Sequence, residues 1–132
     1  MTPITLTELV AVALGGGIGA ALRLITIGWA SRLMGFNFPW GTFTVNVLGS
    51  FIMGALVGWM TVRWDAPAYL RVFLATGILG GFTTFSSYSL DFAMMWQDHR
   101  YVPALLYAGG SVLASIAAVF AGLGLARLVF GN

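Results

Sequence analysis

Four long apolar runs occupy almost the whole chain, and they constrain its fold more than any other feature. The runs cover about residues 4–33, 40–63, 67–97 and 102–130. Each exceeds the roughly 20 residues that cross a hydrocarbon core, and each begins beside a proline, which suits the first turn of a helix. We therefore expect an all-α integral membrane protein, with residues 1–132 forming a single transmembrane domain of four helices. Its expected place is the cell (cytoplasmic) membrane, as a multi-pass protein.

Composition supports a membrane protein and excludes several other classes. The chain is 59% hydrophobic and 8% charged, with a mean hydropathy of +0.92. Six arginines and four acidic residues give too few charges for a nucleic-acid surface, so we expect no nucleic acid as a partner. The expected surrounding is the lipid bilayer. The chain has no cysteine and one histidine, and no base stands in a recognisable relation to a nucleophile. We expect no enzyme activity.

The third run contains a stretch of glycines and hydroxyls that a plain membrane helix does not need. At about 1.5 Å per residue the run would be about 46 Å long, well beyond a hydrocarbon core of about 30 Å. Glycine, threonine and serine gather near residues 77–84. Backbone groups at membrane depth stay outside a helix only where protein, water or an ion satisfies them. The sequence thus predicts a helix broken near its middle that lines a cavity or holds an ion.

The arginines show no bias between the two sides of the membrane. With four spans, one side carries Arg63, Arg71 and Arg127, and the other carries Arg23, Arg32 and Arg100 if the first two belong to the far end of the first helix. This balance gives the positive-inside rule no preference, so the chain could insert in both orientations. Two opposite copies could then pair about a two-fold axis in the membrane plane. We expect an antiparallel, dual-topology homodimer.

Polar and aromatic side chains within the runs are the candidates for function. Asn46 either donates to an anion in a pore or makes a hydrogen bond between helices. Thr42 could add a further polar group to the line of polar side chains that such a pore needs. Phe85 and Tyr88 lie three residues apart on one helix face, where electropositive ring edges could help solvate an anion. Core packing is the alternative for this pair.

Further hydroxyls and one arginine add to this set. Ser87 and Ser111 make a hydrated path more plausible than packing alone. Arg23 falls within or near the membrane, where an ionisable residue is a functional candidate by default. Its long stem could instead carry the charge to the interface.

Several segments together resemble the Fluc family of fluoride channels, also called CrcB proteins, over nearly the whole chain. These segments are Ala20-Ala21-Leu22-Arg23, Trp40-Gly41-Thr42-Phe43-Thr44-Val45-Asn46, Gly80-Gly81-Phe82-Thr83-Thr84-Phe85-Ser86 and Tyr107-Ala108-Gly109-Gly110-Ser111. The family is known as dual-topology dimers that carry fluoride passively and selectively out of cells through two pores. A central structural sodium ion is held by main-chain carbonyls at the helix breaks.

The resemblance implies roles for particular residues. The carbonyls of Gly80 and Thr83, one pair from each subunit, would hold the sodium ion. The fluoride pathway would be bordered by Asn46, Phe85, Tyr88, Tyr107 and Ser111, and Arg23 would stand near a vestibule mouth.

Two positions depart from the family pattern. Tyr88 stands where a second phenylalanine is usual, and its hydroxyl could donate to an anion or turn to a neighbour. Asp91 stands where a glutamate is usual.

Two other classes of function remain open. A small dual-topology, proton-coupled exporter of lipophilic cations needs a carboxylate deep in its first helix, and Glu8 is too near the start. A non-transporting membrane assembly subunit would explain the small-residue faces, which we expect to pack helices together, but not the hydroxyl-rich break. These faces contain Gly15–Gly19 in the first run, Gly54 and Gly58 in the second, and Gly109, Gly110, Gly122 and Gly124 in the fourth.

Overall fold

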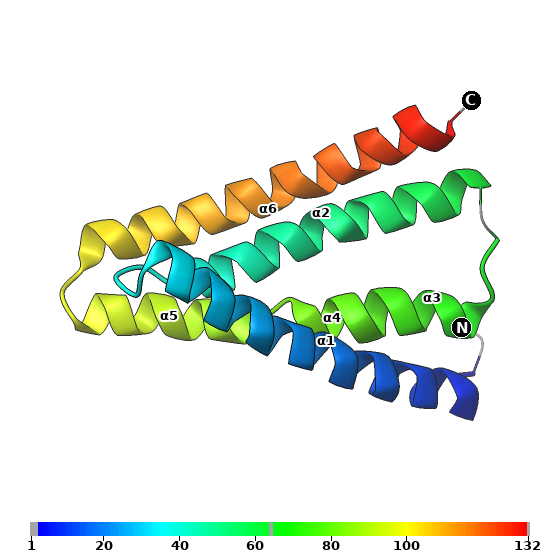
Figure 1. Cartoon of the computed structure of the whole chain (residues 1–132), viewed down its shortest axis with the longest axis horizontal. Coiled ribbons are helices and arrows are strands. Elements are labelled where there is room, and N and C mark those ends of the chain that lie inside the picture. The colour runs from blue at the N-terminus through cyan, green and yellow to red at the C-terminus, as the bar shows by residue number, and fades with distance from the viewer. Residues whose placement is uncertain (1–2, 64, 132) are drawn as a thin grey trace.

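The computed structural model describes residues 3–63 and 65–131, and it is helical almost throughout (Figure 1). Helices α1, α2 and α6 span Leu6–Met34, Trp40–Arg63 and Tyr101–Phe130. The remaining stretch is composed of α3 (Ala68–Arg71), η1 (Val72–Leu79), α4 (Gly80–Phe82) and α5 (Phe85–Gln97). Among the described residues, four stretches are long and apolar enough to cross a membrane. The all-α fold with four candidate membrane-spanning helices is therefore confirmed.

The third stretch is broken between α4 and α5, but the break is shorter than the sequence predicted. Only Thr83 and Thr84 leave helical geometry, with φ/ψ of −82°/158° and −153°/117°. Residues 77–82 are helical, and the Gly80 N–H donates to the Ala75 carbonyl five residues back, in the wide π-helical pattern. The expected second half from about Phe85 agrees with α5.

Two of the glycines placed in the predicted break, Gly77 and Gly81, serve close packing instead. A Cβ atom on Gly81 would lie 2.5 Å from the Gly16 carbonyl oxygen, and one on Gly19 would lie 2.1 Å from the Ile78 carbonyl oxygen. Such distances require glycine, because no other residue lets two helix backbones approach so closely. Helix α1 thus lies directly against η1 and α4, which keeps this first half helical up to Phe82.

A second close pair is formed by α2 and α6, which run side by side (Figure 1). A Cβ on Gly54 or Gly122 would lie 2.2 Å from a carbonyl oxygen of the other helix. The Arg63 Nε atom donates to the Phe130 carbonyl at 2.7 Å, which joins the ends of both helices. The small-residue faces predicted for packing are confirmed here, although a Cβ atom on Gly109 or Gly110 of α6 would meet no described atom within 4 Å.

The ends of the helices match the expected four-span arrangement. The start of α1, the end of α2, the start of α3 and the end of α6 lie at one end of the bundle (Figure 1). Helix α1 begins with a capping box, in which the Thr5 hydroxyl accepts from the Glu8 N–H and the Glu8 carboxylate accepts from the Thr5 N–H. Glu8 is only partly buried at this end, far from the helix break.

Candidate functional site: a polar groove at the helix break

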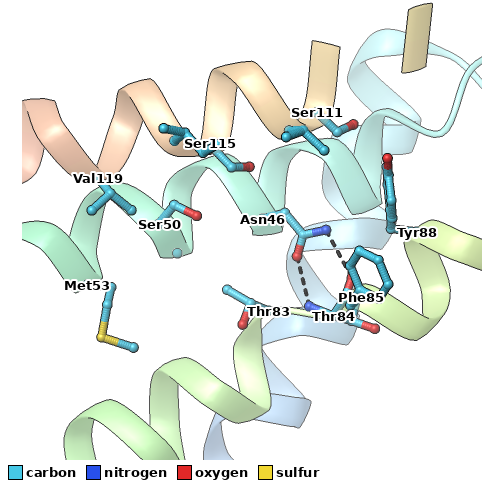
Figure 2. Close-up of a pocket in the computed structure, with 13 residues that line it drawn as sticks. Asn46, Ser50, Met53, Thr83, Thr84, Phe85, Tyr88, Ser111, Ser115 and Val119 are labelled. Carbon is cyan, nitrogen blue, oxygen red and sulfur yellow. Dashed lines mark hydrogen bonds between the residues drawn. The ribbon is translucent and has the colours of Figure 1, made fainter. Parts of the chain in front are cut away.

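A groove of about 370 Å³ lies where α2, α6 and the helix break meet (Figure 2). Its lining comes from three segments: Asn46, Gly49, Ser50 and Met53; Thr83, Thr84, Phe85 and Tyr88; and Ser111, Val112, Ser115, Ile116 and Val119. Every lining side chain is uncharged. The groove therefore offers neutral hydrogen-bonding groups among apolar walls.

Asn46 binds the break through both ends of its amide (Figure 2). Its Oδ1 atom accepts from the Thr84 N–H at 2.8 Å, and its Nδ2 atom donates to the Thr84 carbonyl at 3.0 Å. The hydrogen bond between segments, one of the two interpretations from the sequence, is therefore present. Because a side-chain amide nitrogen carries two hydrogens, a second N–H remains available for another acceptor. Asn46 can hold the break open and still serve as a donor.

Thr84 ends the break by capping α5. Its hydroxyl oxygen accepts from the Ser87 N–H at 3.1 Å and interacts with the Ser87 hydroxyl at 3.1 Å. Ser87 therefore belongs to the cap and lies outside the groove lining. The N-terminus of α5 meets the groove at Phe85, and a helix N-terminus carries a partial positive charge. This end of the groove favours an anion.

Three aromatic rings extend from the groove into the protein. The centroids of Phe85 and Tyr88 lie 5.3 Å apart, and those of Tyr88 and Tyr107 lie 5.2 Å apart. Phe85 is 76% exposed and Tyr107 is fully buried. The Tyr107 hydroxyl donates to Asp91 at 3.0 Å, and Thr42 lies beside it. Tyr107 and Thr42 thus lie behind the residues that line the groove.

The Tyr88 hydroxyl turns to a neighbour, one of the two alternatives that the sequence left open. It donates to the Ala108 carbonyl on α6 at 2.9 Å. With its hydroxyl bonded to α6, the part of Tyr88 left to face the groove is its ring.

The hydroxyl groups along the groove include one with no partner. Ser111 is 4% exposed, and its buried Oγ atom makes no hydrogen bond within the described residues. A buried hydroxyl without a partner costs free energy, so such an atom indicates a ligand or water beside it. Ser50, which the sequence analysis did not select, also lines the groove. Its spacing of four residues from Asn46 could have revealed it, because such residues share a helix face.

The two carbonyls considered for sodium lie at the break. The Thr84 N–H, which a continuous helix would direct to the Gly80 carbonyl, donates to Asn46 instead. The Thr83 carbonyl accepts from the Arg23 guanidinium at 3.4 Å, a long hydrogen bond. Carbonyl oxygens are suitable ligands for a hard cation, so these two groups are of the type that binds sodium. Among the described residues, no group of three histidine, cysteine or acidic side chains offers another metal site.

Comparisons with known proteins agree with this architecture. The family model described as CrcB-like protein, Camphor Resistance (CrcB), matches residues 10–123. The chain is 50% identical over 120 residues to a protein of Mesorhizobium japonicum named fluoride-specific ion channel FluC, covering 91% of this chain and 96% of that protein. A protein of the same name from Caulobacter vibrioides is 48% identical over 126 residues, covering 95% and 99%. One from Agrobacterium fabrum is 49% identical over 119 residues, covering 90% and 95%.

Proposed function

The chain belongs to the CrcB family, and from this premise we propose that it is a passive, selective channel through which fluoride leaves the cytoplasm. Two antiparallel copies would form the channel, with two pores per dimer. The observation that carries the proposal is the groove at the helix break, which contains a buried, unpartnered Ser111 hydroxyl. The names of the similar proteins specify fluoride.

The groove has the donors that a dehydrated anion needs. Fluoride is small and strongly hydrated, so a pore must replace its water without binding it too tightly to release. The second N–H of Asn46, the Ser111 hydroxyl and the α5 N-terminus would supply these contacts, with the edges of Phe85 and Tyr88. The lining contains no carboxylate that would repel an anion.

A second copy of the chain would close the groove. Phe85 is 76% exposed although it stands at the centre of the candidate site, and Gly80 beside the break is also exposed. Both features fit a surface that another subunit covers. The enclosed pore would be narrow enough to exclude chloride by size.

The dual topology predicts that the C-terminus lies on both sides of the membrane. One C-terminal reporter is active only in the cytoplasm and another only outside it, and we expect both to give signals. The arginines near the helix ends are almost balanced, with Arg63, Arg71 and Arg127 on one side and Arg32 and Arg100 on the other. The same two fusions with two lysines added at one helix end serve as the control. In them the C-terminus should lie on one side of the membrane only. Signals from the cytoplasmic reporter alone would rule out dual topology.

The sodium ion is proposed as a structural element that binds the carbonyls of Gly80 and Thr83 from both subunits. It would neutralise carbonyl dipoles at the break and support the dimer. Replacing sodium with N-methylglucamine should lower the unfolding temperature of the purified protein, whereas replacing chloride with gluconate should not. An unchanged unfolding temperature without sodium would exclude a structural sodium ion.

Cells that lack their own fluoride exporters provide a direct test of the proposed function. Expression of this chain should restore growth in millimolar fluoride without affecting sensitivity to lipophilic cations. The exporter alternative predicts the opposite pattern, and Glu8 is poorly placed for it because its carboxylate is part of an exposed helix cap. An assembly subunit predicts neither effect. No growth advantage in fluoride, despite normal membrane expression, would contradict the channel.

A further inference from the structure

Several hydroxyls in the helices of this chain bond back to their own helix, and several do not. Thr26, Thr61 and Ser89 each donate to the carbonyl four residues back, at 2.8, 2.8 and 2.9 Å. This is the usual way in which a serine or threonine satisfies its hydroxyl inside an apolar helix. In contrast, Ser50, Ser111 and Ser115 make no such bond within the described residues, and all three line the groove. The groove therefore contains hydroxyls that are free to bind a ligand.

The position of Ser50 makes it the last polar group on its side of the groove. It lies one helical turn beyond Asn46 on α2, a rise of about 6 Å. Ser115 holds the equivalent place on α6, one turn beyond Ser111 (Figure 2). The lining residues that follow along the two helices are Met53 on α2 and Ile116 and Val119 on α6, which donate no hydrogen bond. Beyond Ser50 the wall is apolar.

We propose that the Ser50 hydroxyl contacts the permeating anion and, with Ser115, forms a second anion position one turn beyond Asn46. This inference rests on the proposed function, because it assigns a residue to the same pore. An anion that leaves Asn46 would otherwise meet the methyl and thioether surfaces of Val119 and Met53 without its water. A hydroxyl at Ser50 supplies a donor at that step.

The absence of an internal partner gives this proposal a sharp test. Because the Ser50 hydroxyl makes no hydrogen bond to any described residue, Ser50→Ala should leave the unfolding temperature unchanged. The fluoride concentration that gives half-maximal efflux from liposomes should rise about tenfold, the effect of one lost hydrogen bond to a charged ligand. Ser50→Thr keeps the hydroxyl and should stay within about threefold of the wild type. Thr61→Val on the same helix removes a hydroxyl that is bonded to its own backbone, and its efflux should match the wild type.

Four results would overturn the inference. Wild-type efflux from Ser50→Ala would show that the hydroxyl does not contact the anion. A lower unfolding temperature, or a Ser50→Thr defect as large as that of Ser50→Ala, would assign Ser50 a packing role. If the wild-type protein itself releases no fluoride, the proposed function fails and this inference fails with it.

Discussion

Asn46→Asp should reduce fluoride efflux by about 100-fold or more in protein that is still folded. The substitution removes the Nδ2 atom, and with it both the bond to the Thr84 carbonyl and the spare N–H. A carboxylate in its place would face that carbonyl oxygen and bring negative charge into an apolar groove, where repulsion of an anion is strong. Efflux from liposomes measured with a fluoride electrode, beside gel filtration of the same sample, tests this expectation.

Asn37→Asp is the matched control, because it makes the same chemical change outside the groove. Asn37 lies in the connection between α1 and α2, and its backbone carbonyl, which the substitution keeps, accepts from Arg100. We expect nearly wild-type efflux from this variant. Unchanged efflux from folded Asn46→Asp would remove Asn46 from the pore.

Gly122→Ala should destabilise the protein by about 3 kcal/mol, since it inserts a methyl group where two helices touch. The new Cβ would lie 2.2 Å from the Phe51 carbonyl oxygen and 2.7 Å from the Ala55 nitrogen. Both are backbone atoms, so α2 and α6 would have to move apart. That movement would also widen the groove, because both helices line it. Thermal unfolding in detergent and the monodisperse fraction measure the loss.

Gly124→Ala provides the comparison two residues further along the same helix. A Cβ at Gly124 would meet nothing within 4 Å among the residues that the structure describes, so the alanine should be tolerated and should slightly favour the helix. Equal stability of the two variants would contradict the close packing of α2 on α6.

Most of the fold could be predicted because hydrophobic length is a strong signal in membrane proteins. The predicted run 40–63 coincides with α2, and the run 102–130 differs from α6 by one residue. The length of the break was harder to predict from the sequence. Gly77 and Gly81 look like helix breakers in the sequence, yet each faces α1 closely and stays helical. Whether a glycine breaks a helix or packs it depends on a neighbour that one sequence does not reveal.

Several residues that line the groove could be selected from the sequence, but their hydrogen bonds could not. Asn46 and Phe85 were selected and do line one groove, but the double hydrogen bond from Asn46 to Thr84 depends on an extended backbone that a helical pattern does not foresee. Ser50 was overlooked because a small hydroxyl beside Gly49 looks like a packing residue. The partner of the Tyr88 hydroxyl lies on another helix, which only the folded chain brings near.

Efflux from liposomes that contain purified protein tests the central claim most directly. The vesicles are loaded with fluoride or chloride, a potassium ionophore dissipates the membrane potential, and ion-selective electrodes follow release. We expect rapid fluoride release and no chloride release above that of protein-free vesicles. Vesicles that contain folded protein but retain fluoride, or release chloride equally well, would contradict a selective fluoride channel.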